Sequence, residues 1–283
     1  MPFVRSPLPP WLPALCRLLL AIALLAAALL GGLWLWQERL LFHPVPLSAS
    51  YPLARQPGVV ERRFVVEGAE LSALHLQLPD PRGVVLFLHG NAGNLAGWFV
   101  DTTLYRDAGF DVLMPDYRGY GKSTGRITSE AQLRADVRAV WAAVAPQYAG
   151  RRVVVLGQSM GSALAAGLAL DMAQGTLPGP APDLTVLVSP YRSVAALAAE
   201  WYPWVPAALL RYPLRTEDAV VRLRSPLLLI HGQADALIAP AHSEALFALA
   251  PQARLVRIPL AGHNDLDRFP AYRQALAAAL AAL

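Results

Sequence analysis

The sequence contains one cysteine, Cys16, one lysine, Lys122, and no block of like charges. A single cysteine excludes an internal disulfide, and Cys16 precedes the apolar run near the N-terminus, so it does not form a lipoprotein cleavage site. The other basic residues are arginines scattered along the chain. A formal net charge of +4 in this dispersed form gives no sign of nucleic-acid binding. The 283 residues also contain no internal repeat.

Apolar residues are abundant and partly concentrated near the N-terminus. They make up 55% of the chain, and the mean hydropathy of +0.38 is high for a wholly soluble protein. Residues 18–36 carry no charge. At about 1.5 Å per residue a helix of this length covers roughly 28 Å, close to the hydrocarbon thickness of a bilayer. Trp34 and Trp36 lie at its end, where indole rings favour the membrane interface, and no A-x-A cleavage pattern follows. The run is therefore predicted to be an uncleaved transmembrane anchor.

The charges that flank the anchor give a weak orientation signal. Arg5 and Arg17 precede it, which favours a cytoplasmic N-terminus and a main domain in the periplasm of a bacterial inner membrane, although arginines at 55, 62 and 63 blur the bias. The chain is predicted to have four parts: a short segment at 1–17, the anchor at 18–36, a proline-rich linker or extended arm at 37–58, and one domain at 59–283.

From residue 59 onward, short apolar runs alternate with helical patterns. Alternating residues predict an antiparallel strand pair at 59–66 and 71–78. Continuous apolar runs predict strands buried on both faces at 83–90, 110–116, 151–157, 183–189, 225–232 and 253–260. Helices are predicted near 95–108, 128–144, 160–174, 240–250 and 267–282, the second opened by a capping box of Ser129 and Gln132. The alternation predicts an α/β fold whose mostly parallel sheet has helices on both faces.

One interval interrupts this rhythm. Residues 191–221 carry Trp201, Tyr202, Trp204 and Tyr212 and are divided by prolines. They are predicted to form a small aromatic cap over the strand ends. Such a cap favours an apolar acyl pocket, but aromatic residues can equally pack against a membrane or the core.

The stretch Gly157-Gln158-Ser159-Met160-Gly161 matches the pattern G-x-S-x-G. In that motif the serine occupies a strained strand-to-helix turn that exposes its hydroxyl. Five residues alone are a weak signal, because glycine-rich turns around serine are common. The apolar strand before Ser159 and the helix after it supply the context that the motif requires, which makes Ser159 a candidate nucleophile.

A serine nucleophile needs a base and an acid that orients the base. Asp235 and His263 follow Ser159 in the order acid then base, each just past the end of a predicted strand. The carboxyl ends of parallel strands share one edge of a sheet, where ligands bind. Asp235 can alternatively cap a helix, and Asp265 and Asp267 are rival acids, but both follow His263.

Two backbone N–H groups are expected to bind the oxyanion. One is that of Met160, at the start of the helix after Ser159, and the other is that of Asn91, in the loop after the strand at 83–90. The histidines at 43, 89 and 231 are interpreted as structural, and those at 75 and 242 have no supporting pattern.

Five motifs in chain order, "FLHGNAGN", "DYRGYGKSTG", "GQSMGSALA", "IHGQADALIAP" and "AGHND", resemble the α/β-hydrolase superfamily over about residues 60–280. More narrowly they resemble its membrane-anchored Bem46-like group, related to α/β-hydrolase domain-containing proteins 13 and 17. By this resemblance Ser159, Asp235 and His263 match the nucleophile, acid and base. Asn91 and Met160 match the oxyanion donors. Some relatives remove palmitate from proteins, but they carry an N-terminal cysteine cluster that this chain lacks.

The expected function is that of a membrane-anchored serine hydrolase that cleaves a carboxylic ester or thioester through an acyl-enzyme on Ser159, with no cofactor or metal. Its expected partners are an acylated small molecule, lipid or protein and the membrane itself, and no nucleic acid. A serine at position 159 argues against the branches of the fold that use aspartate there. An amidase or peptidase, and a membrane interaction protein with a vestigial site, remain the alternatives.

Overall fold

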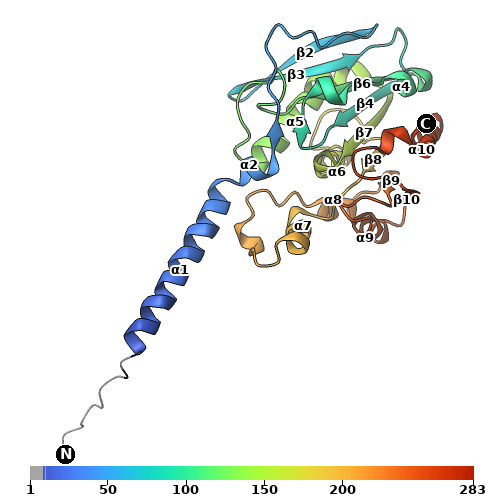
Figure 1. Ribbon diagram of the computed structural model, residues 1–283. Coiled ribbons are helices and arrows are strands. Elements are labelled where there is room, and N and C mark those ends of the chain that lie inside the picture. The colour runs from blue at the N-terminus through green and yellow to red at the C-terminus, as the bar shows by residue number, and fades with distance from the viewer. Residues whose placement is uncertain (1–8, 10) are drawn as a thin grey trace, which may run out of the picture.

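The computed structural model describes residue 9 and residues 11–283, and a long helix projects from the part of the chain that contains the sheet (Figure 1). That helix, α1 (Leu12–Leu35), buries none of its residues, and an 18-residue stretch of it has a mean hydropathy of 2.6. It is the one described helix that is long and apolar enough to cross a membrane. It starts six residues before the charge-free run, since Leu15 and its neighbours also favour helix, and Arg17 lies inside it. Arg5 lies outside the described residues.

An eight-stranded sheet forms the centre of the domain. Its spatial order is β10-β9-β8-β7-β4-β6-β3-β2, in which β3 runs antiparallel to both of its neighbours, β2 and β6, and all other neighbouring pairs are parallel. The strands are β2 (Val59–Val66), β3 (Ala69–Leu76), β4 (Gly83–Leu88), β6 (Phe110–Pro115), β7 (Arg152–Gln158), β8 (Leu184–Val188), β9 (Leu227–Gly232) and β10 (Ala253–Ile258). All eight strands lie where the sequence predicts them, within a few residues, because each combines a continuous or alternating apolar run with turn residues at its ends.

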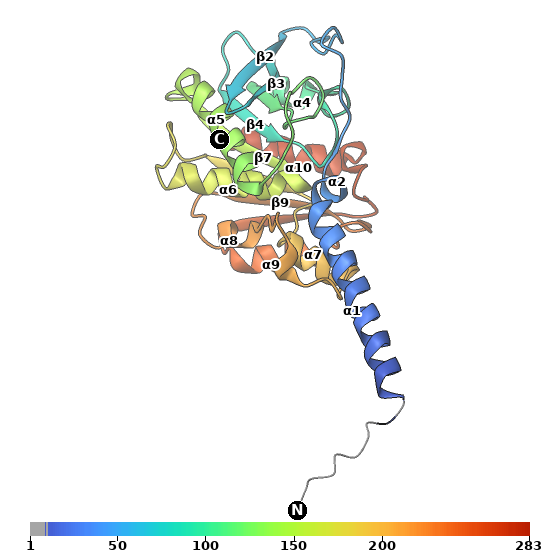
Figure 2. The same ribbon diagram turned by 90° about the vertical axis from the view of Figure 1, so that its left-hand side faces the viewer.

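Helices cover both faces of this sheet, as Figure 2 shows from the side. One face is covered by α5 (Glu130–Val144), α6 (Met160–Ala173), α8 (Thr216–Val220) and α9 (Ala241–Leu249). The other is covered by α3 (Leu95–Trp98), α4 (Thr103–Ala108) and α10 (Pro270–Ala281). Neighbouring residues of β7 point to opposite faces of the sheet. Val153 and Val155 belong to the core under α5 and α6, and Val154 and Leu156 to the core on the other face. This explains why β7 is apolar throughout from Val153 to Leu156, and it confirms the α/β class.

Three helical predictions differ in detail from the structure. The helix expected at 95–108 is two short helices, because Asn94 caps the first (Ala96 N to Asn94 Oδ1, 2.9 Å) and Asp101 accepts from Thr103 N at 2.9 Å to begin the second. The last helix is preceded by a separate 3-10 turn, η3 (Leu266–Arg268). At the start of α5, Ser129 Oγ accepts from Gln132 N at 3.1 Å, but Gln132 Oε1 accepts from Thr128 N and not from Ser129 N.

Residues 37–58 differ from a free linker, because they pack along the domain. α2 (Gln37–Leu41) follows α1 after a break at Trp36. β1 (His43–Pro44) then pairs in parallel with β5 (Ala92–Gly93) in a separate two-stranded sheet. This arm therefore reaches the loop that follows β4.

The predicted cap at 191–221 consists of short helices joined by irregular segments. It contains α7 (Val194–Trp201), the 3-10 helix η2 (Ala207–Leu209) and α8, which belongs to the layer on the sheet. Ser193 caps α7 by accepting from Ala196 N at 3.1 Å. In both views α7 lies on the side of the domain from which α1 projects (Figures 1 and 2).

Candidate active site

Ser159 occupies a tight turn between β7 and α6 with the backbone angles φ 53° and ψ −123°. This conformation is costly for a residue with a side chain and persists only where the surroundings enforce it. The two flanking glycines explain the enforcement. A Cβ on Gly157 would lie 2.2 Å from the carbonyl oxygen of Gly161, and one on Gly161 would lie 2.0 Å from that of Leu88. The turn is therefore a close three-way contact of β7, α6 and β4 that only glycine permits.

Ser159, His263 and Asp235 form one continuous chain of hydrogen bonds. His263 Nε2 lies 2.9 Å from Ser159 Oγ, and His263 Nδ1 lies 2.7 Å from Asp235 Oδ2. The three residues follow β7, β9 and β10, so the parallel register brings loops that are 76 and 28 positions apart in the sequence to one edge of the sheet. Ser159 and Asp235 are buried, and His263 is partly exposed.

Both carboxylate oxygens of Asp235 are occupied. Oδ1 accepts hydrogen bonds from the amides of Leu237 and Ile238 at 2.9 and 2.8 Å, while Oδ2 faces His263. Asp235 does not cap the following helix α9, which begins at Ala241; its Oδ1 instead holds the turn that follows β9. Burial acts to raise the pKa of Asp235, but its contacts with His231, His263 and the Ile238 amide outweigh burial and hold that pKa well below its ordinary value. Asp235 is therefore a permanent anion beside His263.

His231 is closer to this site than sequence reasoning indicates. Its Nε2 lies 3.2 Å from Asp235 Oδ2 and 2.9 Å from the carbonyl oxygen of Ile238, while its Nδ1 lies 2.6 Å from Ser243 Oγ. The available signal is the four-residue spacing of His231 and Asp235 across the turn after β9. His231 therefore contacts the same carboxylate oxygen as His263.

The rival residues have other contacts. Asp265 Oδ1 accepts from the amide of Gly262 at 2.7 Å and so shapes the loop of His263, and Asp267 lines a different cavity. His89 is buried, with its Nδ1 2.7 Å from the carbonyl of Gly90 and its Nε2 3.2 Å from Asp116. The histidines at 43, 75 and 242 form hydrogen bonds with other residues and none with Ser159.

Asn91 and Met160 both line the cavity that contains Ser159. Met160 is the first residue of α6, so its amide lies at the positive end of the helix. The Asn91 side chain donates from Nδ2 to the carbonyl of Leu41 at 3.0 Å, and the backbone carbonyl of Asn91 accepts from His43 N and from the hydroxyl of Tyr120. Within the described part of the chain, neither the Asn91 N–H nor the Met160 N–H donates to a protein acceptor.

The cavity above Ser159 has a volume of about 450 Å³. Besides Asn91, Ser159 and Met160, its walls are mostly apolar and come chiefly from the arm after α1 (Leu41, Phe42), the cap (Val194, Leu197, Trp201, Tyr202) and the loop after β9 (Leu237, Ile238). No group of three histidine, cysteine, aspartate or glutamate side chains able to hold a metal ion occurs among the residues that the structure describes. The site can bind an apolar group next to a polarised hydroxyl.

A mostly parallel sheet with this strand order and a serine–histidine–aspartate chain at its carboxyl edge is the architecture of the α/β hydrolases. Comparison with known proteins agrees with this class. A family model described as "Serine aminopeptidase, S33" matches residues 79–215. An uncharacterized protein of Mycobacterium tuberculosis is 33% identical over 258 residues, which cover 86% of each chain. The human alpha/beta hydrolase domain-containing protein 17B is 29% identical over 204 residues, 70% of this chain and 66% of that one.

Solved structures show the same fold. The Pyrococcus furiosus esterase Pf2001 superposes with a TM-score of 0.64 at 17% identity, covering 84% of this chain and 96% of its own. An alpha-beta hydrolase from Vibrio vulnificus gives 0.67 at 22% identity over 79% and 81%. The chain belongs to the α/β-hydrolase superfamily.

Proposed function

We propose that this protein is a membrane-anchored serine hydrolase that cleaves a carboxylic ester or thioester through an acyl-enzyme on Ser159. The observation that carries the proposal is the hydrogen-bonded chain from Ser159 Oγ through His263 to Asp235, which opens into a largely apolar cavity. The buried anion at Asp235 favours the imidazole tautomer with its proton on Nδ1, which leaves Nε2 free to accept the serine proton.

The reaction proceeds in two displacements. Ser159 Oγ attacks the acyl carbon while its proton passes to His263 Nε2, and the carbonyl oxygen becomes an oxyanion near the Asn91 and Met160 amides. Each such donor stabilises the transition state by on the order of 3 kcal/mol. When the intermediate collapses, the bond to the leaving group breaks and His263 returns the proton to the leaving oxygen or sulfur. Water then attacks the acyl-enzyme by the same route and releases the acid.

A fluorophosphonate probe tests this proposal directly, because it reacts only with an activated serine. The full-length wild type is expected to be labelled, and Ser159→Ala is expected to lose the label. Ser162→Ala is the matched control, because Ser162 lies one turn further along α6 and donates to the Ser159 carbonyl at 2.6 Å. An unlabelled wild type would favour the vestigial interaction protein, and a fully labelled Ser159→Ala would show that another serine is the nucleophile.

An amidase or peptidase of the same fold is the second candidate, and the description of the matching family model favours it. The same residues would act, with His263 protonating an amine leaving group. Ester and amide substrates that share one acyl group separate the two candidates. The esterase proposal expects a much larger kcat/KM for the ester than the chemical reactivity difference alone explains.

We also propose that α1 is an uncleaved anchor with the catalytic domain on the periplasmic side. Its length, its hydropathy and the aromatic residues at its end support the anchor, and the arginines at 5 and 17 support the orientation. A signal peptide would be removed, so the size of the mature chain distinguishes the two. Alkaline phosphatase fused after Leu283 is expected to be active, and an inactive fusion would place the domain in the cytoplasm.

A further inference from the structure

The cap exposes a cluster of aromatic side chains. Trp201, Tyr202 and Trp204 are 58%, 57% and 54% exposed, and the rings of Tyr202 and Trp204 meet edge to face at 6.5 Å. Amphipathic aromatic rings of this kind are typical of the membrane–water interface.

The end of α1 is fixed to the same cap. The Gln37 side chain donates to the carbonyl of Leu209 at 2.8 Å and accepts from the amide of Arg211 at 2.7 Å. The Arg211 guanidinium lies over the Trp34 ring, 4.9 Å from its centre, and forms an ion pair with Glu38 at 2.7 Å. Because of these contacts the domain is not free to tumble on a flexible tether. The cap therefore has a fixed position relative to the end of α1.

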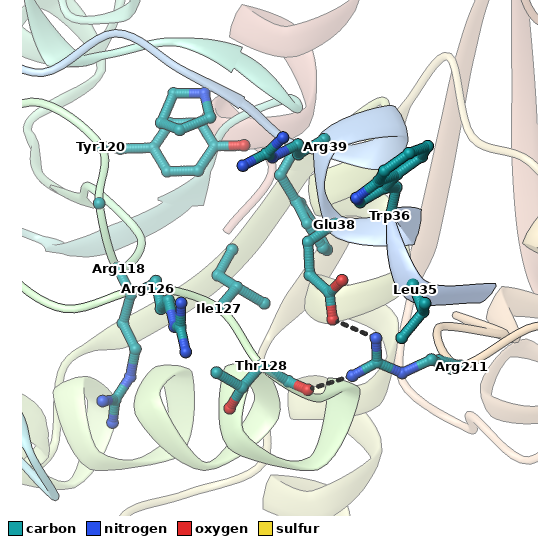
Figure 3. A pocket seen from close by; sticks show the side chains of 13 residues that line it. Leu35, Trp36, Glu38, Arg39, Arg118, Tyr120, Arg126, Ile127, Thr128 and Arg211 are labelled. Carbon is teal, nitrogen blue, oxygen red and sulfur yellow. Dashed lines mark hydrogen bonds and ion pairs between the residues drawn. The ribbon is translucent and has the colours of Figure 1, made fainter. Parts of the chain in front are cut away.

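A second cavity of about 590 Å³ lies where α1 joins the domain (Figure 3). Four arginines line it, and Glu38 is its only carboxylate, already occupied by Arg211 and by the Tyr212 hydroxyl at 2.8 Å. Arg118 is paired with Asp136. The exposed side chains of Arg39 and Arg126 have no carboxylate within ion-pair distance anywhere in the described chain. The cavity therefore carries uncompensated positive charge, and Leu35 and Trp36 form part of its wall.

The Ser159 cavity reaches this same side of the domain. Trp201 and Tyr202 of the exposed cluster are also part of its wall, and Phe42 separates it from the arginine-lined cavity by lining both. An acyl chain leaving Ser159 along the cap would thus pass toward the aromatic cluster.

We propose that this face lies on the bilayer that α1 crosses, and that Ser159 receives an ester whose acyl chain lies in the adjacent leaflet. The aromatic cluster occupies the interfacial layer, and anionic phospholipid headgroups place their phosphates near Arg39 and Arg126. The anchor, the apolar rings and the charge complementarity all indicate the same occupant. The substrate part of this inference rests on the proposed function, whereas the bilayer contact does not.

Depth-dependent quenching tests the contact without an activity assay. With Cys16→Ser as background, Trp204→Cys in the full-length chain carries the only thiol, to which an environment-sensitive fluorophore is attached. In vesicles, nitroxide-labelled phospholipids are expected to quench this label. Val65→Cys is the control, because Val65 is 84% exposed on the edge strand β2 and lines neither the Ser159 cavity nor the arginine-lined cavity. Equal and weak quenching at both positions would overturn the contact.

Two substrates test the route of entry. Trp204 does not line the Ser159 cavity, so Trp204→Ser is expected to keep the turnover of a water-soluble short-chain ester. It is expected to lower hydrolysis of a long-chain ester held in vesicles about fivefold to tenfold, the effect of losing part of one aromatic contact with lipid. Val65→Ser should change neither rate. If Trp204→Ser leaves both rates unchanged while Ser159 still reacts with fluorophosphonate, the entry route is wrong and the proposed function stands.

The arginine-lined cavity has its own test. Hydrolysis of the vesicle-borne ester is expected to be faster in vesicles containing phosphatidylglycerol than in pure phosphatidylcholine, and Arg126→Gln is expected to reduce this difference. Inorganic phosphate in solution distinguishes the sources of the anion. If phosphate removes the difference between the two kinds of vesicle at constant ionic strength, the cavity binds free phosphate and the headgroup assignment fails.

Discussion

Replacement of Gly161 by alanine tests how far the serine turn depends on the close contact of α6 with β4. The added Cβ would lie 2.0 Å from the Leu88 carbonyl oxygen and 2.6 Å from that of His89, whereas ordinary contacts begin at 3.4 Å. Both obstacles are backbone atoms, so no side-chain rotation relieves them. The first turn of α6 must move away from β4 by more than an ångström, and Ser159 moves with it.

The size of the effect follows from this displacement. Overpacking of a tight core typically costs about 1–3 kcal/mol of unfolding free energy. The bond from Ser159 Oγ to His263 Nε2, now 2.9 Å, would lengthen beyond hydrogen-bonding distance. A misplacement of about 1 Å typically costs on the order of 10²-fold in rate. We therefore expect Gly161→Ala to lower both the midpoint of thermal unfolding and, by about two orders of magnitude, the rate of fluorophosphonate labelling.

Gly97→Ala is the matched control, because Gly97 lies in α3 and its added Cβ would meet nothing within 4 Å. It should label at the wild-type rate and unfold at about the same temperature. Wild-type labelling and stability in Gly161→Ala would refute the reasoning, since the turn would then tolerate a side chain at its tightest contact.

Three other predictions follow from the described contacts. Asp235→Asn removes the anion that orients His263 and is expected to lower kcat about 10³- to 10⁴-fold while leaving the fold intact, as measured by ester hydrolysis and circular dichroism. Burial lowers the pKa of His75 from 6.5 to about 4, with a smaller effect from a nearby arginine. The unfolded chain therefore binds this proton more readily, so the unfolding free energy should fall as pH drops from 6.5 toward 4, by up to about 3 kcal/mol. His75→Gln should lose that dependence in urea titrations at a series of pH values. Gln37→Ala leaves the Arg211 amide without its acceptor and should speed its hydrogen exchange, whereas unchanged exchange would contradict the docking of α1 on the cap.

The strands of the sheet, and the chain order of the loops that carry Ser159, Asp235 and His263, could be predicted because both depend on local sequence patterns. The apolar run before Ser159 and the glycines on both sides of it specify a strand, a tight turn and a helix within a few residues. Asp235 could be chosen over Asp265 and Asp267 by chain order alone, and the structure gives Asp265 a contact with the loop of His263.

Contacts between distant segments carry no comparable signal. Residues 37–58 read as a linker because prolines and small residues predominate there, yet β1 pairs with a loop nearly fifty positions away. His231 ends an apolar strand and resembles a structural residue until the turn after β9 brings it next to Asp235. Such pairings depend on how distant segments pack against one another, and the periodicity of the sequence does not indicate this.

The pairing of β1 with β5 determines where a version of this protein without α1 can begin. A chain cut at residue 59 would lose the His43 amide that donates to the Asn91 carbonyl at 2.9 Å, together with Leu41 and Phe42 from the cavity wall. The loop that bears a proposed oxyanion donor would then lose part of its support. A chain that begins at Gln37 keeps all of these contacts. The shortest active version is therefore expected to start directly after α1, and the family motifs alone would place its start about twenty residues too late.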